Sequence, residues 1–183
     1  IYFPKVRYLL TLQEGDPILY IKHRVRFVYP LFRRIFTNAD FIQTISNYLA
    51  NFARDMGYAG PLEVIPNAVN VTHFAQEYAD EDLFTLKQKL GKKDGDKFLI
   101  TTSRMVRKNA VDEVIRALPL LGKHIKFLVL GIGPDEEMLR LLARKLGVED
   151  RVHFIGQVLH TDMPKYLKIS DIFIRPSRSE GLG

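Results

Sequence analysis

The stretch Lys126–Ile155, KFLVLGIGPDEEMLRLLARKLGVEDRVHFI, contains two apolar runs separated by a glycine loop and an amphipathic segment. The runs Lys126–Leu130 and Val152–Ile155 are short, continuous and rich in branched and aromatic side chains, which predicts buried strands. Between them, Asp135–Leu146 predicts a helix with apolar positions at Met138, Leu141, Leu142 and Leu146. Strand, helix and strand in this order indicate a parallel pair joined by a crossover helix.

The same alternation extends over the rest of the chain. Further strands are predicted at Val6–Leu12, Phe41–Ile45, Leu62–Ile65, Lys97–Thr102 and Ile172–Ile174, the last of them buried. Helices are predicted at Ile18–Phe36 with a break at Pro30, from a cap at Ser46 to Gly57, at Ala110–Leu121 and at Asp162–Ile169. Continuous apolar strands alternating with helices predict an α/β fold with parallel sheets covered on both faces.

The composition is that of a globular protein with an excess of positive charge. The chain has 183 residues, 46% hydrophobic and 26% charged, and a formal net charge of +6. A basic balance favours nucleic acid, a phosphate-bearing small molecule or a membrane surface, although many basic proteins bind none of these. The sequence contains no cysteine, which excludes disulfides and thiolate metal sites and fits a cytoplasmic location.

One stretch concentrates the positive charge. Tyr20–Phe36 contains five cations among five aromatic side chains, and no Asp or Glu lies between Asp16 and Asp40. The cations are Lys22, Arg24, Arg26, Arg33 and Arg34. This stretch is a solvated helix face, or it binds nucleic acid through its interleaved cations and aromatics, or it contacts an anionic membrane surface at the inner face of the membrane.

Ligands of parallel sheets bind beyond the carboxyl ends of the strands, so the loops there are the candidates for a site. Arg104 and Lys108 follow one predicted strand and suit a diphosphate, unless they are solvated loop cations. Gly131 and Gly133 follow the next strand and allow a close backbone approach or a tight turn. Glu180 comes before Gly181, Leu182 and Gly183, which offers a carboxylate and amides to a sugar and a phosphate, or forms a flexible turn.

The ordered series of motifs from Ala39 to Gly183 resembles the retaining glycosyltransferases of family 4, which have the two-domain GT-B fold. "VIPNAVNVTHF" is similar to the family's "vIPNGVD...F", and "SRMVRKNAVDEVIRAL" to "GRl...KG.d.lI.A". "MPKYLKISDIFIRPSRSEGLG" resembles "...Y..ad.fv.PS..EgfG". The resemblance implies two Rossmann-like domains, both incomplete in a chain truncated at both ends, with a second glutamate at position 188.

The resemblance also implies the domain limits. Residues 1–70 would be the C-terminal part of the N-terminal, acceptor-side domain, and 71–96 would be the interdomain linker and entry helix. Residues 97–183 would be the N-terminal part of the C-terminal, nucleotide-sugar-binding domain. The acidic run Asp80–Asp82 lies in that linker and is interpreted as a solvated face rather than a metal site. The five histidines show no spacing suited to a metal ion.

The implied reaction moves a sugar from a nucleotide-diphosphate donor to a glycan or lipid-linked hydroxyl acceptor with retention of configuration, without a metal or other cofactor. Arg104 and Lys108 would bind the diphosphate, and Glu180 the sugar. Gln13 stands where many members carry the histidine that touches the sugar, and Ser103 and Ala68 replace usual glycines. The alternative is a basic binding module for nucleic acid or another polyanion, a partner that the resemblance does not imply. The sequence leaves the oligomeric state open.

Overall fold

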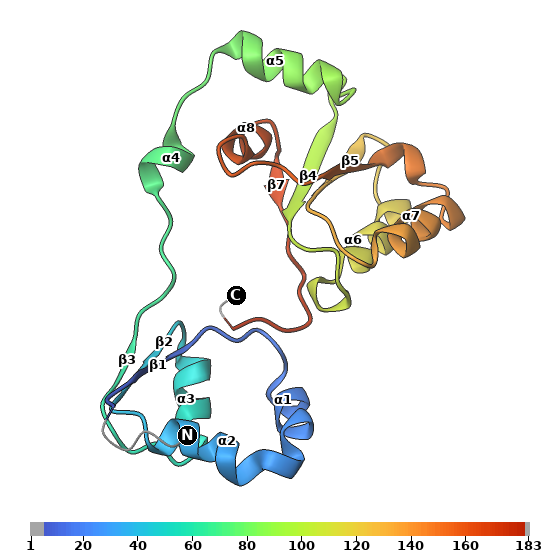
Figure 1. Cartoon of the computed structure of the whole chain (residues 1–183). Coiled ribbons are helices and arrows are strands. Elements are labelled where there is room, and N and C mark those ends of the chain that lie inside the picture. Colours follow the sequence, from blue (N-terminus) through green and yellow to red (C-terminus); the bar gives the residue numbers. More distant parts are fainter. Residues whose placement is uncertain (1–5, 182–183) are drawn as a thin grey trace. The chain divides into compact units, whose positions relative to one another are not determined.

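The computed structural model describes residues 6–181, which form two compact units. The first unit contains the described residues up to Val69 together with Ser179–Gly181, and the second contains Asn70–Arg178. Figure 1 shows both units, coloured along the chain. Ser179–Gly181 group with the first unit, whereas the sequence analysis placed them with the domain that begins at residue 97.

The first unit contains a three-stranded parallel sheet with the order β1-β2-β3. The strands are β1 (Leu9–Leu12), β2 (Phe41–Thr44) and β3 (Leu62–Val64), and the α-helices are α1 (Ile18–Arg24), α2 (Tyr29–Thr37) and α3 (Asn47–Asp55). Ser46 caps α3 by accepting a hydrogen bond from the N–H of Leu49, as predicted. Gly57 follows α3 with a φ of 86°, the conformation that a terminating glycine adopts.

The predicted break in the helix over Ile18–Phe36 lies earlier than expected. The chain leaves α1 at Val25 and passes through a 3-10 turn, η1 (Arg26–Val28), before α2 begins. Pro30 lies in the first turn of α2. A proline is tolerated there because the first N–H groups of a helix have no partner within the helix.

The second unit contains a four-stranded parallel sheet with the order β6-β5-β4-β7. The strands are β4 (Lys97–Thr102), β5 (Ile125–Leu130), β6 (Val152–Gly156) and β7 (Ile172–Phe173), and the α-helices are α4 (Val71–Ala75), α5 (Asp80–Lys89), α6 (Val111–Ala117), α7 (Glu136–Lys145) and α8 (Met163–Lys168). Helices α6 and α7 lie on one face of the sheet, and α5 and α8 lie on the other (Figure 1). Both faces are therefore covered, as the continuous apolar strands predicted.

The structure shows which of the apolar positions in α7 are buried, and it corrects the predicted burial of β7. Helix α7 buries Leu139 and Ala143, while Met138 and Leu141 are exposed. The spacing of Leu139, Leu142, Ala143 and Leu146 forms one helix face, and that face packs on the core. The strand predicted to be buried at Ile172–Ile174 is exposed at both residues of β7, because β7 is an edge strand that pairs with β4 alone among the described residues.

The segment predicted as a linker is largely helical. Helices α4 and α5 both belong to the second unit, and Leu83, Leu86 and Leu90 pack against the core under α5. The acidic residues Asp80, Glu81 and Asp82 form the exposed first turn of α5. Negative charge is favourable at a helix N-terminus, so these three acidic residues stabilise the start of α5.

Asp171, just before β7, ties the start of that strand to β4. Its carboxylate accepts hydrogen bonds from Lys92 at 2.7 Å, Lys97 at 2.9 Å and the Phe98 N–H at 2.8 Å. Burial opposes the charge of this carboxyl, but the three donors outweigh burial and hold the pKa of Asp171 well below its ordinary value.

Replacing Asp171 with asparagine is expected to lower the free energy of unfolding at pH 7 by about 1.5–3 kcal/mol, the range for hydrogen bonds to a charged group. Since the folded-state pKa is depressed, this stabilisation is complete above the unfolded pKa of about 3.9 and is lost as the pH falls below it. Urea unfolding at pH 7 and pH 3 tests this, with Asp94→Asn as the exposed acid-to-amide control. A deficit that is the same at both pH values would contradict it.

Candidate functional site

The loop after β4 carries the first predicted site residues. Arg104 is exposed two residues beyond the strand, and Lys108 is half-buried in the 3-10 turn η2 (Arg107–Asn109). The buried Asn109 connects the two ends of this loop, because its Nδ2 donates to the carbonyl of Arg104 at 2.7 Å. The structure therefore places Arg104 and Lys108 in one ordered loop of the second unit.

Gly131 and Gly133 pack against this loop. A Cβ on Gly131 would lie 2.1 Å from the carbonyl oxygen of Ser103, and one on Gly133 would lie 2.2 Å from that of Met105. The Met105 N–H donates to the carbonyl of Ile132 at 3.1 Å. These two glycines therefore allow the loop after β5 to pack closely against the backbone on either side of Arg104.

Three buried oxygens in β4 and the loop that follows it lack a donor. Thr101 Oγ1, Ser103 Oγ and Asn109 Oδ1 accept no hydrogen bond from any residue in the described part of the chain. Buried polar atoms without a partner are rare, and in native structures they call for a water, an ion or a functional role. These atoms therefore call for a water or a polar group, and Ser103 also lines a hollow at the carboxyl ends of the strands.

Asn109 is a residue that the sequence analysis missed. In the motif "GRl...KG", the lysine stands five residues after the arginine, and counting from Arg104 this position is Asn109, not Lys108. The motif's glycine falls on Ala110, which adopts a left-handed φ of 55° that glycine favours, and this supports the register. The role predicted for Lys108 therefore rests on its charge and its place in the turn.

A hollow of about 240 Å³ lies at the carboxyl ends of the strands in the second unit. It is lined by Thr102 and Ser103 after β4, by Leu130 and Gly131 after β5, and by Gln157, Val158 and Met163. The last three residues were not predicted. The rule that parallel sheets bind ligands at this edge could have found them, since Gln157 directly follows β6.

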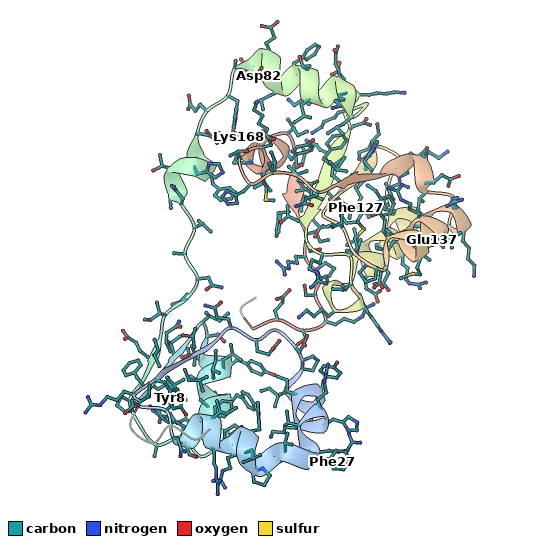
Figure 2. The ribbon with its side chains drawn as sticks, viewed as in Figure 1. Tyr8, Phe27, Asp82, Phe127, Glu137 and Lys168 are labelled. Atoms are coloured by element: carbon teal, nitrogen blue, oxygen red, sulfur yellow. The ribbon has the colours of Figure 1, made fainter. Side chains whose placement is uncertain are left out.

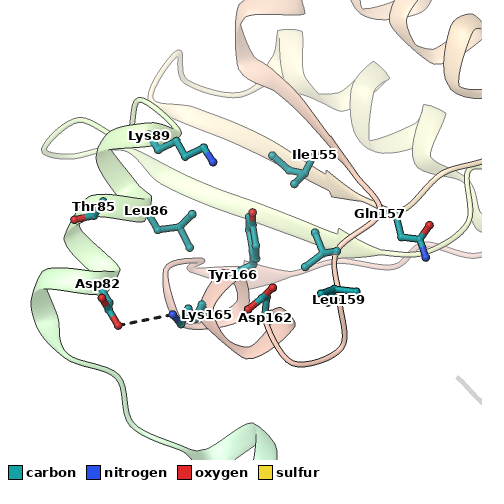
Figure 3. Close-up of a pocket in the computed structure, with 11 residues that line it drawn as sticks. Asp82, Thr85, Leu86, Lys89, Ile155, Gln157, Leu159, Asp162, Lys165 and Tyr166 are labelled. Atoms are coloured by element: carbon teal, nitrogen blue, oxygen red, sulfur yellow. Dashed lines mark ion pairs between the residues drawn. The ribbon is translucent and has the colours of Figure 1, made fainter.

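A larger hollow of about 420 Å³ lies between α5 and α8 (Figure 3). Its wall includes Leu86, Ile155 and Tyr166, and Asp82 pairs with Lys165 at 3.7 Å on its rim. Two acidic and two basic side chains line it, namely Asp82, Asp162, Lys89 and Lys165. Because these charges balance, this hollow suits a diphosphate less well than the loop that carries Arg104 and Lys108.

The remaining predicted residues belong to the first unit. Gln13 is exposed in the loop after β1, and the half-buried Glu180 and buried Gly181 group with this unit. A Cβ on Gly181 would lie 2.1 Å from the carbonyl oxygen of Glu14, so the loop of Gln13 packs on the backbone of Gly181. Leu182 and Gly183 lie outside the described residues.

The acidic and imidazole side chains offer no metal centre. Within residues 6–181, no three His, Asp or Glu side chains cluster in a way that could hold an ion. His73 and His160 stack with ring centroids 4.7 Å apart, and His73 Nε2 lies 2.9 Å from the carbonyl oxygen of His160. Burial lowers the pKa of His153, which favours its neutral form.

Comparison with known proteins agrees with the resemblance. Residues 82–183 match the family model described as glycosyl transferases group 1. A GDP-mannose-dependent alpha-(1-6)-phosphatidylinositol monomannoside mannosyltransferase of Mycobacterium tuberculosis is 30% identical over 155 residues, covering 82% of this chain and 40% of that protein. The alpha-monoglucosyldiacylglycerol synthase of Streptococcus pneumoniae is 33% identical over 124 residues, covering 66% of this chain and 28% of that protein.

Solved structures show the same fold. Anabaena Alr3699/HepE in complex with UDP and glucose matches with a TM-score of 0.78 at 19% identity, over 93% of this chain and 46% of that one. Sucrose-phosphate synthase from Thermosynechococcus elongatus matches with a TM-score of 0.78 at 20% identity, over 97% of this chain and 46% of that one. The fold is therefore of the GT-B type, and the chain spans about 40% of the length of the curated mannosyltransferases that it matches.

Proposed function

The chain belongs to the group 1 glycosyl transferases, and from this we propose that its parent protein transfers a hexose from a nucleotide-diphosphate sugar to a hydroxyl acceptor with retention of configuration. The observation that carries the proposal is the ordered loop after β4. It holds Arg104 and Lys108 at the carboxyl ends of the strands, where parallel folds bind ligands. The Oγ of Ser103, which is buried without a hydrogen-bond partner in the described part of the chain and belongs to a residue lining the hollow at the carboxyl ends of the strands, supports a polar ligand there.

In this proposal the two cations act on the donor's diphosphate. A guanidinium and an ammonium group stabilise the negative charge that grows on the phosphate as the bond to the sugar breaks. Glu180 would accept hydrogen bonds from sugar hydroxyls, and the backbone amides of Gly181 to Gly183 would donate to the sugar and phosphate. No metal or other cofactor takes part, since the fixed cations supply the charge stabilisation.

Calorimetric titration of the full-length protein with GDP and UDP tests this proposal. We expect saturable binding of one of them that is unchanged by EDTA. The alternative of a polyanion-binding module predicts instead a salt-dependent affinity for heparin or single-stranded DNA without saturable binding of either nucleotide. Binding of a nucleotide only in the presence of a divalent cation would contradict the metal-free mechanism.

We further propose that the acceptor is lipid-linked and that the first unit meets a cytoplasmic, anionic membrane surface. Around η1 the apolar side chains Leu19, Phe27, Val28 and Leu31 are exposed, Phe27 by 84%. Figure 2 labels Phe27 among the side chains of the first unit. Beside them, the guanidinium of Arg26 lies 4.3 Å from the Phe27 ring centroid, and Lys22 and Arg24 end α1. Arg33 is not counted with this surface, because its Nε donates to the carbonyl of Met56 at 3.0 Å within the first unit. None of the helices within residues 6–181 is long and apolar enough to cross a membrane.

Sedimentation of the full-length protein with vesicles tests this surface. Replacing Phe27 with serine is expected to weaken binding to anionic vesicles about tenfold, from the apolar area that is no longer buried. Replacing Arg26 with glutamine should weaken it about fivefold at low salt, about 1 kcal/mol per cation, with a smaller effect at high salt.

Phe84→Ser is the matched control, because Phe84 is also exposed but lies on α5 beside three acidic residues. It should leave vesicle binding unchanged. Equal binding of the unaltered protein to neutral and anionic vesicles, or equal losses for Phe27→Ser and Phe84→Ser, would overturn the assignment of this surface.

A further inference from the structure

Arg178 makes an unusual set of contacts for an exposed arginine. Its backbone N–H donates to the carbonyl of Lys108 at 2.7 Å. Its guanidinium donates to the carbonyl of Arg107, to both carboxylate oxygens of Asp112 at 3.1 and 2.9 Å, and to Glu113 at 2.6 Å. One residue thus holds two consecutive carbonyls of the turn η2 and two carboxylates in the first turn of α6.

The turn that Arg178 contacts depends on such external contacts. Ala110 follows it with a φ of 55°, a conformation that is unfavourable for a residue with a Cβ and that needs support from the surrounding structure. Inside the loop, the Asn109 N–H donates to the carbonyl of Val106 at 2.9 Å, and the Ala110 N–H donates to that of Arg107 at 3.3 Å. Arg178 adds the contacts on the carbonyls of Arg107 and Lys108.

The contacts to the carboxylates keep the guanidinium in place. Burial opposes the charge of Asp112, but the hydrogen bond from Arg178 outweighs it and holds the pKa of Asp112 below its ordinary value. The Asp112 carboxylate is therefore ionised at neutral pH. An arginine suits this arrangement because its planar fork donates in several fixed directions at once, which a lysine ammonium cannot reproduce.

We propose that Arg178 is a positioning residue for the donor site. It fixes the backbone of η2, and this fixed backbone orients the Lys108 side chain toward the diphosphate. This inference rests on the proposed function for its consequence in binding, but the fixing of the turn is a separate claim that can be measured without a ligand.

Hydrogen exchange in the full-length protein tests the fixing of the turn. Arg178→Ala should speed exchange of the Asn109 and Ala110 amides about tenfold, because local opening of the turn becomes easier. Arg178→Lys should speed it nearly as much, since the charge stays but the fork is lost. Arg116→Ala is the matched control, because Arg116 also pairs with Asp112, at 3.9 Å, but touches neither carbonyl in the contacts described above. Unchanged exchange in Arg178→Ala, or an equal change in Arg116→Ala, would overturn the proposal.

A double-mutant cycle tests whether Arg178 acts through Lys108. Arg178→Ala should weaken binding of the nucleoside diphosphate about five- to tenfold in the unaltered protein and hardly at all in a Lys108→Ala background, because coupled residues are not additive. Equal losses in both backgrounds would exclude Lys108 as the intermediary and overturn the positioning role. If the unaltered protein binds neither GDP nor UDP, the proposed function fails, and the exchange experiment still decides whether Arg178 fixes the turn.

Discussion

Replacing Arg104 with alanine in the full-length protein is expected to slow sugar transfer roughly 10²–10³-fold, the loss seen when one donor to developing charge is removed. Arg104 is exposed at the carboxyl end of β4, and its carbonyl is held by Asn109, so its backbone is fixed before a ligand binds. A preorganised cation stabilises the leaving diphosphate more than it stabilises the intact donor. The turnover number should therefore fall much more than the Michaelis constant for the donor rises.

Steady-state kinetics with varied donor concentration measure this split. Arg107→Ala is the matched control, because it removes the same charge from the same loop, and the exposed Arg107 is not among the predicted site residues. A raised Michaelis constant with unchanged turnover in Arg104→Ala would mean that Arg104 only binds the donor. Equal losses in Arg104→Ala and Arg107→Ala would mean that the total charge of the loop, and not the position of Arg104, is what matters.

The elements of both sheets were predictable because each strand is a short apolar run bounded by glycine, proline or polar residues. Strand β4 has the predicted bounds, Lys97–Thr102, and Ser46 caps α3 as its sequence position suggested. Burial of single side chains was less predictable. The apolar positions of α7 exceed those that one face can hold, so Met138 and Leu141 fit the pattern but are exposed. Only the packing of α7 against the sheet selects Leu139 and Ala143.

The candidate site was predictable as far as it depends on strand ends. Parallel strands align their carboxyl ends, so Arg104, Gly131 and Gly133 could be placed together beyond those ends from the sequence alone. The contacts of Arg178 could not, because residues 178 and 112 meet only after β7 pairs with β4. The role of the glycines was left open between a ligand and a turn, and their neighbours, Ser103 and Met105, became known only from the structure.

Those two glycines should be among the least replaceable residues of the second unit. At Gly131 a Cβ would meet the Ser103 carbonyl at 2.1 Å, and the φ of 132° is itself rare for residues with a side chain. At Gly133 only the clash with Met105 applies, at 2.2 Å. Gly147, which ends α7, has a φ of 65° but open space around its Cβ position. The three positions therefore separate the cost of the clash from the cost of the backbone conformation.

Replacing each glycine with alanine should give three different losses in the free energy of unfolding. We expect about 1–2 kcal/mol at Gly147 for the left-handed conformation, about 1–3 kcal/mol at Gly133 for overpacking, and about 3–5 kcal/mol at Gly131, where both apply.

The two loop variants should also slow transfer by up to about 10²-fold, because a shift of the Ser103–Met105 backbone by about 1 Å displaces Arg104 from the diphosphate. Gly147→Ala should leave the transfer rate unchanged, since the loop that carries Arg104 contacts Gly133 and Asp135, before α7 begins, whereas Gly147 follows its last turn and has open space at its Cβ position. Urea unfolding and single-turnover kinetics measure the two effects. Normal transfer by a folded Gly133→Ala protein would show that the glycines serve stability alone and that the position of Arg104 does not depend on them.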